Sequence, residues 1–137
     1  MLMGFEEFRQ KCLKGSFDYD LNHKKYAEYF RDNAKVGDGV TVNLWSDRHA
    51  YTIIKRTPKS LTLRRCKATL APEFKPEFVP GGFCAHCTNQ DDQEYIYEED
   101  ENGQIEKAYW SERKHGFYVG GCMSVSAGRH EFYDYNM

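Results

Sequence analysis

The sequence predicts an α+β fold in which two N-terminal helices precede an antiparallel β-rich body of about six strands. Two observations predict it. Apolar residues recur at helical spacing in the first quarter of the chain and alternate with polar residues after Val40, as in half-buried strands. The length of 137 residues suits one domain. We therefore expect a single domain with a helical element at residues 1–35 and a β-rich body at residues 36–137.

The first helix is expected at residues 4–14, where Phe5 and Phe8 fall on one face. The second is expected to begin at Asp20, a suitable N-cap, and to end near Gly37. The aromatic residues on its apolar side are Tyr26, Tyr29 and Phe30. Packing in the core or between subunits is the simplest role for these rings. Together the helices carry more apolar surface than one layer on a sheet needs, so we expect a homo-oligomer, a dimer or larger, held partly by the helices.

The β-rich body is expected to be a meander of short strands with polar turns between them. The expected strands are residues 40–45, 51–55, 61–67, 95–97, 105–110 and 117–125. The fourth and fifth of these are predicted to form a hairpin around the turn at residues 100–103. The loop at residues 71–82 contains Pro72, Pro76 and Pro80, which exclude regular helix and central strand.

Charge and composition exclude several classes of protein. The net charge of −2 at pH 7 gives no overall cationic field, so we expect no DNA partner. No apolar run reaches the length of a membrane helix, about 18 residues, so we expect no membrane partner. The first ten residues do not resemble a signal peptide. Five cysteines, an odd number, favour free thiols and a cytoplasmic location.

A Cys-x-x-Cys lies in the decapeptide GGFCAHCTNQ at residues 81–90, with His86 between Cys84 and Cys87. Structural zinc takes four ligands, usually as two close pairs, and the remaining cysteines are isolated. A redox pair normally opens a helix, whereas this one follows Gly-Gly in a loop. We therefore expect no metal and no cofactor, and we keep a small zinc-binding module as an alternative.

The chain offers binding groups rather than reacting groups. It lacks Gly-x-Ser-x-Gly, the phosphate-binding Gly-x-x-x-x-Gly-Lys and His-Glu-x-x-His, so we expect no catalytic residues and no enzyme. Aromatic rings for a base, arginines for phosphates and amides for hydroxyls together favour a nucleotide ligand. The basic residues are Arg64, Arg65, Lys67, Arg113, Lys114 and Arg129, the planar ones Trp45, Phe83, His86 and Trp110, and the amides Asn89 and Gln90.

Several stretches resemble the phage-encoded anti-Thoeris sponge family. They are VGDGVTVNLWSDRHAYTII at residues 36–54, Lys-Ala-Thr at 67–69, the decapeptide at 81–90 and the ending Gly-Arg-x-Glu-Phe-Tyr-Asp-Tyr at 128–135. Residues 1–35 resemble the family only as two helices. The resemblance implies an oligomer with an N-terminal helical element, a β-rich body and pockets at subunit interfaces.

The resemblance also implies a function. Sponges of this family sequester the glycocyclic ADP-ribose signals made by bacterial TIR immune enzymes, and some also hold cyclic oligonucleotides. By this likeness Phe83 would stack on the base, Arg113 and Arg129 would contact the phosphates, and Arg65 would be a third basic contact. Asn89 and His86 are assigned to the ligand site only because they lie in the loop that resembles the family.

We therefore expect a non-catalytic sponge for a small-molecule cyclic nucleotide signal in the cytoplasm of an infected bacterial host cell. The alternative from a different class is a small phage protein that binds a host protein surface through its aromatic and acidic residues.

Overall fold

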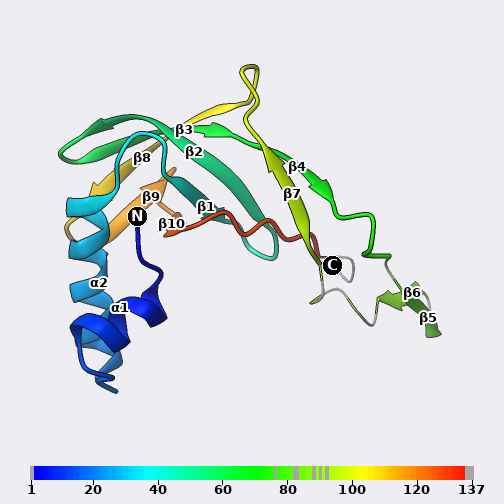
Figure 1. The fold of residues 1–137 in the computed structure, drawn as a ribbon, viewed down its shortest axis with the longest axis horizontal. Coiled ribbons are helices and arrows are strands. Elements are labelled where there is room, and N and C mark those ends of the chain that lie inside the picture. Colours follow the sequence, from blue (N-terminus) through cyan, green and yellow to red (C-terminus); the bar gives the residue numbers. More distant parts are fainter. Residues whose placement is uncertain are drawn as a thin grey trace.

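The fold is a closed antiparallel barrel with two N-terminal helices and a two-stranded arm (Figure 1). The structure, a computed structural model, describes residues 2–75, 77–81, 84–87, 89, 91 and 93–134, and for residues 78–81 and 84–87 it describes the backbone alone. The helices are α1 (Phe5–Cys12) and α2 (Tyr19–Asn33). The barrel strands are β1 (Gly39–Asn43), β2 (Arg48–Thr57), β3 (Ser60–Arg65), β8 (Ile105–Ser111), β9 (Gly116–Val119) and β10 (Met123–Ala127). The α+β class predicted from the sequence is confirmed.

The barrel is a meander that closes on itself. Its strands follow one another around the ring in the order β1-β2-β3-β8-β9-β10, and β10 pairs with β1. Alternate residues of each strand point inward, because successive side chains of a strand face opposite sides. Val42, Ile53, Leu61, Leu63 and Ala108 are each at most 2% exposed in this interior.

The helix α2 covers one end of the barrel. Phe30 and Ala34, at the end of α2, belong to the barrel core, and the ring centroids of Phe30 and Phe117 lie 6.0 Å apart. The predicted N-cap is wrong by two residues: Asp18, rather than Asp20, accepts a hydrogen bond from the backbone N–H of Leu21 at 3.2 Å. The helix therefore begins at Tyr19.

The helix α1 packs against α2. Phe8 is buried, and its ring centroid lies 5.4 Å from that of Tyr26 and 4.9 Å from that of Tyr29. The hydroxyl of Tyr26 donates a hydrogen bond to the carbonyl of Met3 at 2.7 Å. Burial raises the pKa of Tyr26 to about 12, so this phenol stays a neutral donor. Part of the aromatic surface of the helices is thus used within the chain.

The predicted hairpin on either side of residues 100–103 is wrong. The turn is present, with the N–H of Gly103 donating to the carbonyl of Asp100 at 2.9 Å. However, β7 (Tyr95–Glu98) pairs with β4 (Lys67–Leu70), whereas β8 pairs with β3. The turn therefore joins two sheets. Figure 1 shows β4 and β7 as an arm away from the helices, followed by the short pair β5 (Phe78–Gly81) and β6 (Cys84–Cys87).

The single strand predicted at residues 117–125 is in fact two strands. The chain reverses at Gly120 and Gly121, whose φ angles of 61° and 75° lie in the left-handed region that glycine adopts without strain. This reversal places Met123 opposite Val119 and gives β10 the position from which it closes the barrel on β1.

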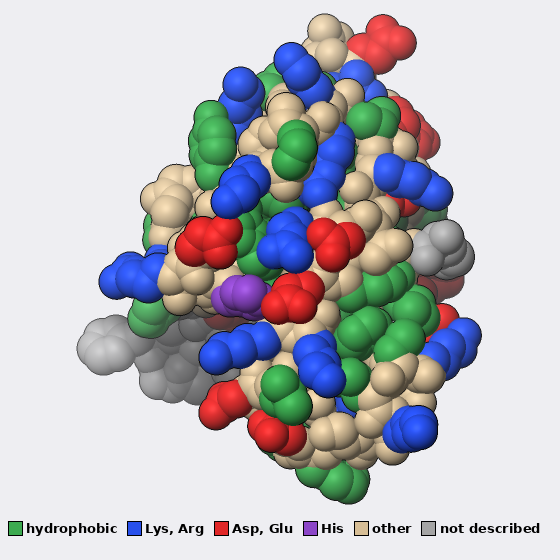
Figure 2. Space-filling model, turned by 90° about the vertical axis from the view of Figure 1, so that its left-hand side faces the viewer, with side chains coloured by type: hydrophobic (Ala, Val, Ile, Leu, Met, Phe, Trp, Pro, Cys, Tyr) green, Lys and Arg blue, Asp and Glu red, His purple; other side chains and the backbone are tan. Residues whose placement is uncertain are grey.

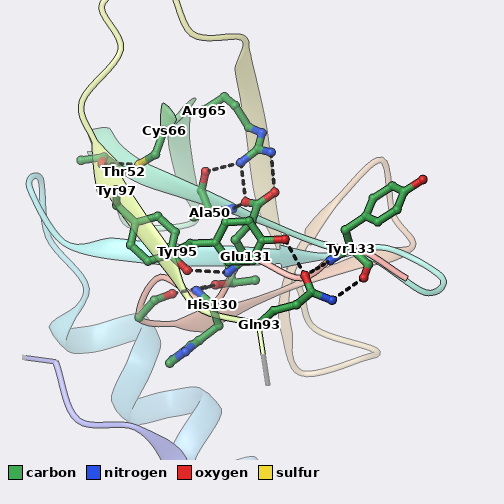
Figure 3. A network of polar contacts seen from close by, with 12 residues as sticks. Ala50, Thr52, Arg65, Cys66, Gln93, Tyr95, Tyr97, His130, Glu131 and Tyr133 are labelled. Atoms are coloured by element: carbon green, nitrogen blue, oxygen red, sulfur yellow. Dashed lines mark hydrogen bonds and ion pairs between the residues drawn. The ribbon is translucent and has the colours of Figure 1, made fainter. Parts of the chain in front are cut away.

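The segment after β10 fastens the arm to the barrel (Figure 3). The carboxylate of Glu131 accepts hydrogen bonds from the backbone N–H of Ala50 at 2.8 Å and from both terminal nitrogens of Arg65 at 2.7 Å. The backbone N–H of Glu131 donates to the hydroxyl of Tyr97 at 2.8 Å. One residue therefore links β2, β3 and β7.

Protonation of His49 is expected to destabilise the fold. Burial, and secondly the positive charge of Arg65, lowers the pKa of His49 below its usual 6.5. The folded state therefore favours the neutral ring, and its contribution to stability is complete above the unfolded pKa and is lost as pH falls toward the folded pKa. We expect the free energy of unfolding in urea to fall from about pH 7 to about pH 5, with a shallower slope in His49→Gln.

The control is His130→Gln, which removes an exposed imidazole. Equal slopes in the wild type and in His49→Gln would contradict the role given to His49.

Candidate ligand-binding groove

A groove lies between α2 and the barrel wall formed by β8, β9 and β10. It encloses about 400 Å³, within the usual range for small-molecule sites. The residues contributed by α2 are His23, Tyr26, Ala27 and Phe30, which follow the i, i+3, i+4, i+7 spacing of one helix face. Facing residues from the barrel include Trp110, Phe117, Tyr118, Ser124, Val125 and Ser126.

Packed rings form the walls of this groove. Phe5 stacks on His23 with ring centroids 4.5 Å apart and planes 21° apart, and it meets Tyr26 edge-on at 5.6 Å. On the barrel side, Trp110 makes an edge contact with His115 at 5.1 Å. Walls of this kind suit a flat ring ligand, which gains from stacking and from edge contacts.

The groove runs into a second cavity, of about 330 Å³, that carries positive charge. The residues lining this second cavity are Asp20, His23, Lys24, Arg113, Lys114 and His115, of which His23, Lys114 and His115 also line the groove. Arg113 is exposed and pairs with no carboxylate among the described residues. The ammonium group of Lys114 lies 4.8 Å from the ring centroid of Tyr118 and contacts the carbonyl of Gly121. An anionic group here would meet several cationic donors.

Figure 2 looks at the molecule from the side of the helices. Lys and Arg side chains are spread over this face, with acidic side chains between them. The net charge of the chain therefore does not indicate the electrostatic potential in the cationic cavity, because that potential depends on the basic side chains that line the cavity.

The turn between β8 and β9 holds the basic side chains in place. The backbone N–H of His115 donates to the carbonyl of Ser111 at 2.7 Å, and that of Lys114 donates to the Ser111 hydroxyl at 3.1 Å. The Nε2 atom of His115 lies 3.2 Å from a carboxylate oxygen of Glu28 on α2. Since the turn is tied to α2, the two sides of the cationic cavity keep a defined spacing.

Arg65, one of the predicted ligand residues, is already paired (Figure 3). Its guanidinium makes the bidentate contact with Glu131 and lies 5.8 Å from the ring centroid of Tyr51. A phosphate at this position would have to share the guanidinium with that carboxylate.

Arg129 is engaged in a separate network. It donates to the hydroxyl of Thr52 at 2.8 Å and to the carboxylate of Glu99 at 2.9 Å. The hydrogen bond that Glu99 accepts from Thr52 is the largest of the effects that lower the pKa of Glu99, which keeps this partner ionised. A Cβ atom on Gly39 would lie 2.9 Å from Cζ of Arg129, so the guanidinium packs on that glycine. The described cavities do not bring Arg129 together with Arg113.

The backbone of His86 belongs to β6, where the sequence predicted a loop. The side chain of Asn89 joins two backbone groups: its amide oxygen accepts from the N–H of Glu77 at 2.7 Å and its amide nitrogen donates to the carbonyl of Lys75 at 2.8 Å. Phe83 and the side chain of His86 lie outside the described part of the chain. Their assigned ligand contacts stay predictions.

Sequence reasoning missed most of the groove. It assigned the aromatic residues of both helices, Phe5 among them, to the core or to subunit packing and gave no role to His23. A signal was present, because His23, Tyr26 and Phe30 share a helix face next to the basic residue Lys24. What the spacing did not show is that the β8–β9 turn lies opposite that face.

No protein-family model, curated protein or solved structure matches this chain. No helix in the described part of the chain is long and apolar enough to cross a membrane. Among residues whose side chains are described, no group of three or more His, Cys, Asp or Glu residues is placed to hold a metal ion. The side chains of Cys84 and Cys87 are not among those described. Fold and groove define a small helix-capped antiparallel barrel with a site suited to an anionic ligand that carries a flat ring.

Proposed function

We propose that this protein binds a cyclic ADP-ribose-type signal without changing it chemically and withholds the signal from its receptor, as a phage sponge in an infected bacterial cell. The observation that carries the proposal is the continuity of the aromatic groove with the cationic cavity at Arg113 and Lys114. Such a ligand has a flat purine and linked phosphates, and it needs both kinds of surface. The motif resemblance to anti-Thoeris sponges selects this ligand class among nucleotides.

In this proposal the purine lies against the wall formed by Phe5, His23 and Tyr26. The phosphates lie in the cationic cavity, where Arg113 is the best donor because its planar fork can meet two phosphate oxygens at once. The arrangement binds and orients the ligand, and release returns it intact.

The affinity that a sponge needs favours an oligomer. Nanomolar binding corresponds to about −12 kcal/mol, whereas roughly 35 heavy atoms at about 0.3 kcal/mol each give about −10 kcal/mol. A second subunit that covers the groove would supply further enclosure of the ligand. The homo-oligomer thus remains part of the proposal, and a monomer mass by light scattering at micromolar concentration would count against it.

The test is calorimetric titration of glycocyclic ADP-ribose isomers into the wild type, Arg113→Ala and Lys114→Ala. Each charged contact to a desolvated phosphate contributes about 1.5–3 kcal/mol, so each variant should bind about ten- to a hundredfold more weakly. Because both side chains are exposed, the variants should unfold at the same urea concentration as the wild type.

Two further variants sharpen this result. Lys107→Ala removes an exposed lysine of β8 that lines neither cavity, and it should bind normally. Arg129→Ala tests the residue that the motif resemblance assigns to the phosphates, with folding checked because Arg129 pairs with Glu99. Full affinity in Arg113→Ala and Lys114→Ala together with loss in a folded Arg129→Ala would move the site away from the groove.

The second candidate function is binding to a host protein surface. It is favoured by exposed apolar side chains around the start of α2, since Phe17 is 79% exposed and Tyr19 is 62% exposed. If the wild type binds none of the isomers, this candidate replaces the first.

A further inference from the structure

A separate cavity lies at the barrel end remote from α2. Arg56, toward the end of β2, donates a hydrogen bond to the carbonyl of Arg31 on α2, whereas His49 lies near the beginning of the same strand. Around His49 the strand ends enclose about 190 Å³, which we call the mouth cavity. The mouths of β-barrels are recurring places for small-ligand sites.

Apolar side chains form much of the mouth cavity. Val42 and Val119 belong to the barrel core, and Leu44 and Met123 pack against that core. An apolar cavity of roughly 150 Å³ holds benzene. The mouth cavity, at about 190 Å³, therefore has room for one ring with a short substituent.

Two polar groups in this cavity have no hydrogen-bond partner. Tyr51 is only 5% exposed, and its hydroxyl bonds to no residue that the structure describes. The ring nitrogens of His49 likewise make no hydrogen bond within the described part of the chain. Both groups keep some contact with solvent, since neither is among the fully buried polar atoms that lack a partner. Both are therefore available to an occupant of the cavity.

The charge of the mouth cavity comes from Glu106. Its carboxylate accepts a hydrogen bond from the amide of Gln104 at 2.6 Å, and no described Lys or Arg pairs with it. Arg65 is nearby, but its charge is balanced by the bidentate pair with Glu131. Burial lowers the pKa of His49 and keeps that ring neutral near neutral pH.

The other charge that acts on His49 is Asp47, which is also acidic. Once the Arg65–Glu131 pair is set aside, the charged groups around the mouth cavity are therefore carboxylates.

We propose that the mouth cavity binds a small organic cation, a primary ammonium group carried by one aromatic or apolar ring. The ammonium group donates to Glu106 and to the free acceptor positions of Tyr51 and His49, and the ring contacts Val42 and Met123. This site is distinct from the groove at α2, because the two share no lining residue. The two sites can therefore be tested with separate variants.

The test uses benzylamine as the probe, followed by the backbone amide signals of the 15N-labelled full chain. We expect saturable shifts confined to the strand ends around the mouth cavity, with a dissociation constant of about 1 mM. Benzoate, which has the same ring and the opposite charge, should give none. Glu106→Gln should weaken benzylamine binding about tenfold or more, because the ion pair is replaced by a neutral contact.

The matched control is Glu112→Gln, which neutralises an exposed carboxylate at the other end of β8 and should bind benzylamine normally. A native amide spectrum of each variant shows that the fold is intact. If wild type shows no saturable shifts at the mouth cavity, or if benzoate binds equally well, the proposal is wrong. Unchanged affinity in a folded Glu106→Gln would overturn it as well.

Discussion

Replacing Glu131 by alanine is expected to lower the free energy of unfolding by about 2–4 kcal/mol. The change removes the carboxylate that holds Arg65 at 2.7 Å and accepts the N–H of Ala50 at 2.8 Å. The side chains of Arg65 and Glu131 are only 25% and 10% exposed, so a largely buried guanidinium would lose its counter-ion. Urea unfolding followed by circular dichroism measures the loss.

The matched control is Glu112→Ala. Glu112 likewise forms an ion pair, with Lys59 at 2.9 Å, but both of these side chains are more than 60% exposed. Exposed pairs of this kind contribute about 0.5 kcal/mol or less. Adding Arg65→Met to Glu131→Ala should recover part of the loss, because it removes the unpaired charge. Equal losses in Glu131→Ala and Glu112→Ala would show that the Arg65 pair does not hold the C-terminal segment.

Gly103→Ala should destabilise the protein by about 2–3 kcal/mol. A Cβ atom there would overlap the main-chain carbonyl oxygen of Arg65 and lie 3.0 Å from that of Asp100. Main-chain atoms cannot rotate aside as a side chain can. The turn is also held close to β3, because the carbonyl of Gln104 accepts a hydrogen bond from the N–H of Arg65 at 2.8 Å. The turn would have to move away from β3, and the shift would appear in urea unfolding.

Gly4→Ala is the control for this change. No atom lies within 4 Å of a Cβ built on Gly4, and alanine at this N-cap should cost about 1 kcal/mol or less. A loss of the same size in Gly103→Ala would mean that the turn tolerates a side chain and does not approach β3 as closely as the structure places it.

Local pattern was sufficient for most elements of the fold. Alternation at Val40 and Val42 and at Leu61 and Leu63 predicted strands whose inward residues are buried. The pattern failed where strand pairing depends on distant segments. Residues 100–103 were read correctly as a turn, but β7 pairs with β4 because the chain between them forms an inserted arm.

The candidate site was predicted only in part. Of the proposed phosphate-binding residues, Arg113 lies in the cationic cavity, and the sequence marked it as a basic residue in a turn. The carboxylates with which Arg65 and Arg129 pair were not predicted. Their partners, Glu131 and Glu99, lie 66 and 30 positions away in the chain.

By itself, the sequence determined the fold class, the two helices, the positions of most barrel strands and the faces that are buried, because hydrophobic spacing is a local property of each segment. Only the tertiary structure decided which charges are paired and which remain available. Barrel closure brings the C-terminal segment onto β2 and β3, where Glu131 neutralises Arg65, and it places the β8–β9 turn against α2, where Arg113 has no such partner among the described residues. Contacts of this kind depend on how distant segments meet in space, and spacing along the chain does not encode that.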